Sequence, residues 1–289
     1  MIKKISNIII SILVTFVLLT LLDIPNKCII GKTDYQKDIN NKKDNNKKNK
    51  IEDNNKEEKE EQETQAEDNS QLESFQNNED QIVNKKTIVI DPGHSSNPKS
   101  DNEPLYEGST NMKVMDTIGA CGINGIYEYS INNDVAKLLK NDLESRGFNV
   151  VLTKNNVETD LSNIERAEIG NDNNADLVIR IHCDSFDDSS ANGASMLVPA
   201  NNSITGNIYN SSRKYGEIIL NSYTNKVPIK NRGIVETSEM TGFNWSKVPI
   251  VLIELGFLSN QGDDSYISNS NNYQLMVSGI GEGIEKCFW

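Results

Sequence analysis

Residues 161–185 read LSNIERAEIGNDNNADLVIRIHCDS, and this stretch decides the fold class. Its first part, over 161–171, has the character of a helix, with Asp160 or Ser162 placed to cap the N-terminus. A mostly apolar run, ADLVIRI, follows over 175–181, which is typical of a buried strand. A helix that leads directly into a buried strand indicates an α/β domain.

The same alternation of strands and helices extends outward on both sides of this stretch. Short apolar runs predict further strands at 87–90, 148–152, 193–198, 233–235 and 248–253. Apolar residues at helical spacing predict further helices at 130–146, 207–223 and 273–286. Such alternation predicts a single α/β domain with a mostly parallel sheet that helices cover.

The composition of the 289-residue chain excludes several classes of protein. Its formal net charge is −13, which argues against nucleic-acid binding, because that would need a basic face. It contains two histidines, which makes a zinc site with three histidine ligands impossible. Four cysteines are too few for a disulfide-dense scaffold in a chain of this length.

The N-terminal residues, 1–32, have the pattern of a membrane-targeting segment. An apolar stretch over 8–22 (IIISILVTFVLLTLL) follows Lys3 and Lys4, and no small-residue cleavage motif comes after it. Its length lies between that of a signal-peptide core and that of a minimal membrane helix. We expect an uncleaved signal anchor with its N-terminus inside, and a cleaved signal peptide is the alternative. In either case the rest of the chain is expected to be exported.

A segment of different composition, 33–85, follows the apolar stretch. Asn, Lys, Glu, Asp and Gln dominate it, so it cannot bury enough apolar surface to fold. It is predicted to be a disordered charged linker, and a charged helix over 56–67 is the alternative. The chain is thus divided into an anchor or signal peptide (1–32), a linker (33–85) and a folded domain (86–289).

Four side chains with metal-binding or acid–base chemistry fall at or near the predicted carboxyl ends of strands: His94, Glu128, His182 and Glu254. Sites gather at this edge in open α/β sheets. Two imidazoles and one carboxylate are a common ligand set of catalytic zinc, and a carboxylate outside the set can act as a general base. Structural explanations remain open: packed histidines, a strand-end glutamate that meets solvent, and a glutamate that the helix dipole favours.

Five sequence blocks occur in a fixed order between about residues 87 and 288. They are IVIDPGH (88–94), the block around Glu128 (119–154), the block that leads into His182 (161–185), NRGI (231–234) and VPIVLIELGFLSN (248–260). Together they resemble the type 3 family of zinc-dependent N-acetylmuramoyl-L-alanine amidases, which are bacterial cell-wall hydrolases. DPGH alone is a weak signal, whereas five blocks in order are specific.

The resemblance implies that His94, Glu128 and His182 bind one zinc ion and that Glu254 is the catalytic carboxylate. It implies a twisted, mostly parallel sheet of about six strands flanked by helices. The implied substrate is the amide between N-acetylmuramic acid and L-alanine in peptidoglycan. A zinc peptidase acting on other wall-peptide bonds and a non-catalytic wall-binding protein are the alternatives. The expected partners are peptidoglycan and, through the N-terminal segment, the cytoplasmic membrane, and the need for a protein activator stays open.

Two features depart from the family pattern. The polar segment 95–116 (SSNPKSDNEPLYEGSTNMKVMD) is inserted between two implied ligands, and it either shapes the cleft or is ordinary surface variation. Arg180 and Cys183 stand where small residues are expected. Cys183 is disfavoured as a further ligand, because neighbouring residues on a strand point to opposite faces.

The sequence leaves two smaller questions open. Trp245 lies just before the last predicted strand, where its indole either contacts glycan or packs in the core. An exported domain permits a disulfide among Cys121, Cys183 and Cys287, and free thiols are equally compatible with their spacing.

Overall fold

The computed structural model describes residues 85–289. The predicted anchor and nearly all of the predicted linker lie outside the described residues. Within the described part of the chain, no helix combines the length and the apolar composition needed to cross a membrane.

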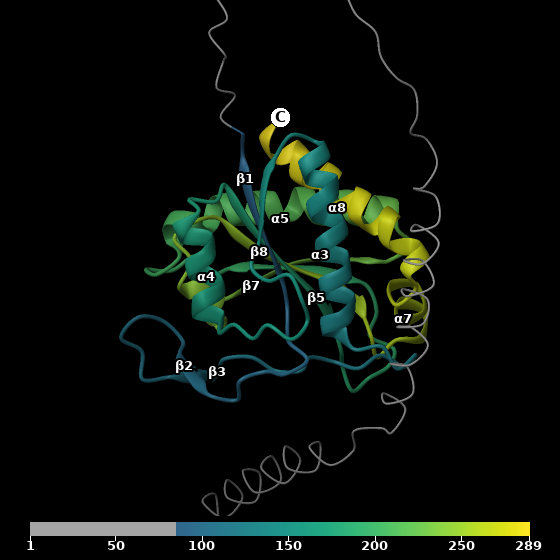
Figure 1. Cartoon of the computed structure of the whole chain (residues 1–289), viewed down its shortest axis with the longest axis horizontal. Coiled ribbons are helices and arrows are strands. Elements are labelled where there is room, and N and C mark those ends of the chain that lie inside the picture. Colours follow the sequence, from purple (N-terminus) through teal and green to yellow (C-terminus); the bar gives the residue numbers. More distant parts are fainter. Residues whose placement is uncertain (1–84) are drawn as a thin grey trace, which may run out of the picture. The chain divides into compact units, whose positions relative to one another are not determined.

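A sheet of six strands forms the centre of the domain (Figure 1). Its strands are β1 (Thr87–Pro92), β4 (Asn149–Leu152), β5 (Leu177–Asp184), β6 (Ala194–Pro199), β7 (Asn231–Thr237) and β8 (Ile250–Phe257). Their spatial order is β4-β1-β5-β8-β6-β7, and every neighbouring pair is parallel except β8 with β6. The prediction of a mostly parallel sheet of about six strands is therefore confirmed.

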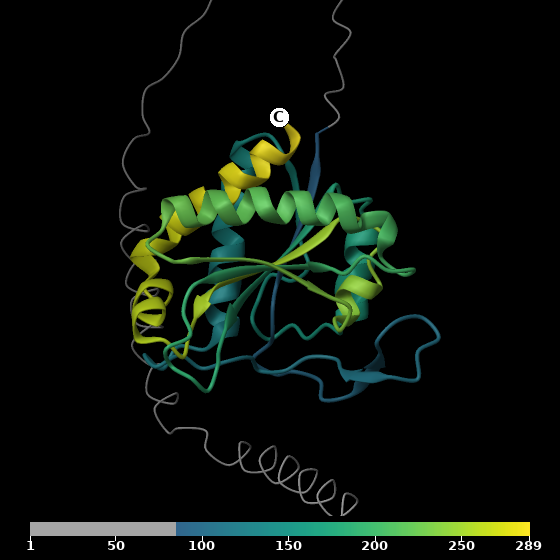
Figure 2. The same ribbon diagram turned by 180° about the vertical axis from the view of Figure 1, so that it is seen from behind.

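Helices cover both faces of this sheet. They are α3 (Glu128–Ser145), α4 (Asn163–Asp172), α5 (Gly206–Lys226), α6 (Thr241–Asn244), α7 (Gln261–Ile267) and α8 (Tyr273–Phe288), with a short 3-10 helix, η2 (Ser270–Asn272), before α8. Figures 1 and 2 show α3 and α8 on one side of the strands and α4 on the other.

Successive residues of the strands enter two different cores. In β1, Ile88 and Ile90 belong to the core formed with α3, α5 and α8, whereas Val89 belongs to the core that contains Phe243 of α6. Neighbouring side chains of a strand point to opposite faces. Burial of both faces explains why the strands read as continuous apolar runs.

A capping box fixes the start of α4. The Ser162 hydroxyl accepts a hydrogen bond from the backbone N–H of Glu165, and the Glu165 carboxylate accepts one from the N–H of Ser162. Of the two residues that the sequence offered as a cap, Ser162 is therefore the one used. The cap fixes the residue at which α4 begins and therefore the positions of the side chains in its first turns.

The inserted segment 95–116 was expected to be a polar loop, and it contains a short antiparallel hairpin. Its strands are β2 (Asn102–Pro104) and β3 (Met112–Val114), which form a separate two-stranded sheet (Figure 1). Glu103 of β2 is 1% exposed, and its carboxylate accepts hydrogen bonds from the backbone N–H groups of Asn163 and Ile164, both at 3.1 Å. A carboxylate at a helix N-terminus is stabilised by the free N–H groups and the helix dipole, so the hairpin is anchored to α4.

Candidate metal centre

His94 and His182 come from two adjacent parallel strands. His94 follows β1, and His182 lies in β5, which pairs with β1. Their rings meet edge to face, with centroids 4.8 Å apart. Gly93 allows this approach, because a Cβ atom at that residue would lie 2.2 Å from Cε1 of His182.

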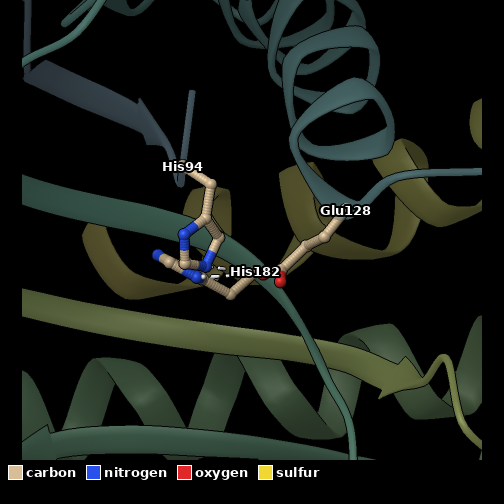
Figure 3. Close-up of side chains that lie close together, drawn as sticks. All are labelled: His94, Glu128 and His182. Carbon is tan, nitrogen blue, oxygen red and sulfur yellow. Dashed lines mark hydrogen bonds and ion pairs between the residues drawn. The ribbon is translucent and has the colours of Figure 1, made fainter. Parts of the chain in front are cut away.

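The carboxylate of Glu128 lies next to both imidazoles (Figure 3). Glu128 is the first residue of α3, and its Oε1 is 3.2 Å from Nε2 of His94 and 3.1 Å from Nδ1 of His182. One potential ligand atom from each of the three residues lies within 4.8 Å of the other two. The structure thus brings together the three residues that the sequence analysis named as zinc ligands.

Backbone and amide groups hold the Glu128 carboxylate in place. The N–H of Ala120 donates to Oε2 at 2.8 Å, and the N–H of Cys183 donates to Oε1 at 3.0 Å. Nδ2 of Asn132, one turn along α3, donates to Oε1 at 3.3 Å. Burial alone would raise the pKa of Glu128, but the two imidazoles hold that pKa well below its usual range. The group is therefore an ionised carboxylate, as a metal ligand must be.

The two imidazoles differ in their electrostatic surroundings. Burial lowers the pKa of His182 to about 4, so its ring is neutral, and its Nε2 has no hydrogen-bond partner among the described residues. Burial would also lower the pKa of His94, but the carboxylates of Asp116 and Glu128 raise it to about 9. A divalent cation competes with protons for such a site. Two ring nitrogens and one ionised carboxylate are a donor set that fits zinc.

Glu254 lies beside this cluster and is not part of it. In β8 it pairs in register with His182 of β5, and residues paired in this way project to the same face of the sheet. Its Oε2 is buried and lacks a hydrogen-bond partner in the described part of the chain. Burial raises the pKa of Glu254 well above its usual range, and the charge of Glu128 raises it further. A carboxylate with a raised pKa is a stronger base than an ordinary carboxylate.

His182 and Glu254 were expected at the ends of their strands, and both lie inside them. β5 continues to Asp184 and β8 continues to Phe257. The backbone pairing persists beyond the two residues, where the N–H of Leu258 donates to the carbonyl of Asp184 at 2.8 Å. The register shifts between His182 and Asp184, so the strands are irregular just after the site.

A buried ion network that the sequence analysis did not identify lies three residues before His94. The carboxylate of Asp91 accepts from Nη1 of Arg166 at 2.7 Å, from Nε of Arg180 at 2.8 Å and from the Thr153 hydroxyl at 2.6 Å. Burial alone would raise the pKa of Asp91, but the two guanidinium groups hold it well below its usual range. Arg180 stands where the family pattern has a small residue, and a buried arginine requires a charged or polar partner. Arg180 was therefore the feature of the sequence from which this buried ion network could have been predicted.

Among the described cysteines, Cys183 and Cys287 are free thiols. Cys183 does not join the potential ligands: it is buried, and its Sγ lies 3.6 Å from Oδ1 of Asn132.

Trp245 contacts the inserted hairpin and lines a cavity away from the candidate metal ligands. Its indole N–H donates to the carbonyl of Pro104 in the inserted hairpin at 3.1 Å. It also lines a cavity of about 470 Å³, together with Tyr106 and Glu168. The residues that line this cavity include none of the candidate metal ligands.

Comparison with known proteins gives a consistent result. The model of a family described as N-acetylmuramoyl-L-alanine amidase matches residues 88–286. The chain is 29% identical over 198 residues to the N-acetylmuramoyl-L-alanine amidase LytC of Bacillus subtilis, and the match covers 68% of this chain and 34% of that protein. It is 26% identical over 206 residues to the probable cell wall amidase LytH of Staphylococcus epidermidis, which covers 70% of this chain and 58% of that protein. The chain thus spans about a third to somewhat over half of these relatives.

A solved structure supports the same fold. The N-acetylmuramoyl-L-alanine amidase from Clostridium difficile 630 is similar with a TM-score of 0.58 and 25% sequence identity. The similarity covers 70% of this chain and 96% of that structure.

Proposed function

The chain belongs to the N-acetylmuramoyl-L-alanine amidase family, and from this premise we propose that it hydrolyses peptidoglycan with the help of zinc. The proposed bond is the amide between the lactyl group of N-acetylmuramic acid and L-alanine. The observation that carries the proposal is the cluster of His94, Glu128 and His182, whose ligand atoms lie within 4.8 Å of one another.

The three clustered residues would hold the zinc ion, and Glu254 stands outside the ligand set. When bound, zinc would polarise the scissile carbonyl and lower the pKa of a water molecule toward about 7. Glu254 would take the proton of the attacking water and later pass it to the departing alanine nitrogen. Its raised pKa suits both steps, because a carboxylate that binds a proton more tightly is a stronger base.

Product analysis of digested peptidoglycan tests this proposal. The chain is incubated with purified peptidoglycan and zinc, and the new amino termini are identified by labelling and mass spectrometry. Free L-alanine amino termini are the expected result. New termini elsewhere in the stem peptide would indicate a zinc peptidase, and intact peptidoglycan would indicate a non-catalytic wall-binding protein.

We further propose that the chain acts outside the cytoplasm and is held at the membrane. The support is the uncharged apolar stretch over 8–22 behind Lys3 and Lys4 and the charged segment that follows it. The acidic balance of the chain offers no reason to expect nucleic acid as a partner. Peptidoglycan is the proposed macromolecular partner.

A further inference from the structure

His94 is the least constrained of the three potential ligands by regular structure. It follows the end of β1 and has a φ of 65°, a left-handed conformation that residues other than glycine rarely adopt. Glu128 and His182, by contrast, belong to α3 and β5. The orientation of the His94 ring must therefore be set by groups outside the strand.

Those groups come from the last residue of the inserted segment, Asp116, and from Thr117, which follows it. Nδ1 of His94 lies 3.1 Å from the carbonyl oxygen of Thr117 and 3.1 Å from its hydroxyl. The carboxylate of Asp116 stands 3.5 Å from the same nitrogen. The carbonyl oxygen and the carboxylate on this side favour a proton on Nδ1, so a bound metal would take the place of any proton between Nε2 and Glu128.

Asp116 is itself held by a buried arginine. Nη2 of Arg166 lies 3.2 Å from Oδ2 of Asp116, and both side chains are under 10% exposed. The same guanidinium donates through Nη1 to Asp91 at 2.7 Å and to the carbonyl of Pro92 at 2.9 Å. One arginine thus fixes both the backbone just before His94 and the carboxylate behind its ring.

The inserted segment is tied to the helix that carries this arginine. Nδ2 of Asn163, at the start of α4, donates to the carbonyl of Met115 at 2.6 Å and to the Glu103 carboxylate at 2.8 Å. These contacts bind the stem of the hairpin to α4 one turn before Arg166. A continuous series of polar contacts, from 2.6 to 3.5 Å, therefore connects the hairpin to the His94 ring.

We propose that Asp116, supplied by the inserted segment and held by Arg166, is a positioning residue for His94 that orients its ring with Nδ1 protonated and Nε2 available to the metal. The inference rests on the proposed metal site and adds to it a role for the insertion. Partners of this kind on ligating histidines change metal affinity by about 10- to 100-fold.

Zinc affinity of the full-length chain, measured in detergent by competition with a fluorescent chelator, tests the proposal. We expect Asp116→Asn to weaken zinc binding by about 10-fold or more. Glu107→Gln removes the same charge from an exposed position of the hairpin and should leave the affinity unchanged. An Asp116→Asn affinity equal to that of the unmutated chain would overturn the proposal.

His94→Ala separates this inference from the proposed function. If that variant binds zinc as tightly as the unmutated chain, the metal site itself is wrong. If His94→Ala loses zinc while Asp116→Asn does not, the site stands and the role of Asp116 fails.

A measurement on the unmutated chain covers the case in which Asp116→Asn does not fold. The chain has two histidines, so the zinc-loaded protein gives few imidazole ¹⁵N and ¹H signals, and through-space contacts to Thr117 identify those of His94. We expect a hydrogen-bonded proton on Nδ1 of His94. A proton on Nε2, with the metal on Nδ1, would overturn the proposal.

Discussion

Glu254 carries the proposed proton transfers, because both histidines are already committed to the metal cluster. The chain has no further histidine that could serve as the base. Glu254→Gln preserves the shape of the side chain and removes its basicity, so we expect hydrolysis to fall by about 10²- to 10⁴-fold. The number of zinc ions per chain, measured by atomic emission, should stay the same.

His182→Ala is the matched comparison for this variant. It removes a potential ligand, so both bound zinc and hydrolysis should be lost. Full hydrolysis in Glu254→Gln would refute the role of Glu254, and undiminished zinc in His182→Ala would remove that residue from the ligand set.

The grouping of His94, Glu128 and His182 was implied by the resemblance to the amidase family, whereas the groups that hold these residues were not. The two histidines of the chain follow or lie in the neighbouring strands β1 and β5, which favoured a shared site but did not exclude structural roles. Aspartate is common in the chain, and the pairing of Asp91 with Arg166 spans 75 residues. Which carboxylate meets which guanidinium depends on side-chain directions that the local pattern does not encode.

Three elements meet at the Asp91 carboxylate, since β1 supplies it and α4 and β5 supply the two arginines. Asp91→Asn leaves two buried guanidinium groups short of a charge partner, so we expect it to lower the free energy of unfolding by about 3–5 kcal/mol at pH 7. Chemical denaturation of the unmutated chain and the variant measures this difference.

The pH dependence of that difference follows from the lowered pKa of Asp91. The Asp91 carboxylate becomes protonated at a higher pH in the unfolded chain than in the folded chain. Its contribution to the free energy of unfolding is therefore complete above the ordinary aspartate pKa of about 3.9. It is lost progressively as the pH falls below that value. We expect a constant difference from pH 7 to about pH 4.5 and a smaller one at pH 3. A difference that already vanishes at pH 6 would contradict this assignment.

Helices α5 and α8 approach each other closely at two glycines of α8. A Cβ atom on Gly283 would lie 2.7 Å from Cα of Ile219, and one on Gly279 would lie 3.0 Å from Cα of Tyr223. Backbone atoms cannot move aside as side-chain ends do, so we expect Gly283→Ala to destabilise the domain by about 1–3 kcal/mol. Zinc affinity should not change.

Gly206→Ala, at the first residue of α5, is the control for this variant. A Cβ there would meet Oδ1 of Asn201 at an ordinary 3.5 Å, so the melting temperature should hardly change. Equal melting temperatures for Gly283→Ala and the unmutated chain would show that the two helices can separate without cost.

Elements with long apolar patterns were predicted well, and short polar ones were missed. The strands β5 and β8 and the helices α3 and α8 all lie near their predicted positions. The hairpin strands β2 and β3 have three residues each, and α6 has four, which is too short for a periodic pattern. They are held by contacts with other elements, since β2 and α6 contact α4 and β3 pairs with β2.

The charge of the whole chain bears on where we propose that it is held. Residues 86–289 contribute most of the net charge of −13, and a surface of that sign is repelled by anionic wall polymers. Electrostatic attraction to the wall would therefore not hold the chain at the cell surface. We propose that the apolar stretch over 8–22 does so, because burial of such a segment in a bilayer would favour membrane attachment.

Exchange of residues 1–32 for a cleavable signal peptide tests this proposal. The exchanged protein should still be exported but should appear in the culture medium, since it lacks the apolar segment. Peptidoglycan hydrolysis per molecule should be unchanged, because the candidate metal ligands all lie after residue 93. Fractionation of cells and medium, with quantification of the protein in each, measures the effect. Unchanged retention after the exchange would mean that another part of the chain binds the cell surface, and the N-terminal segment would then be no more than an export signal.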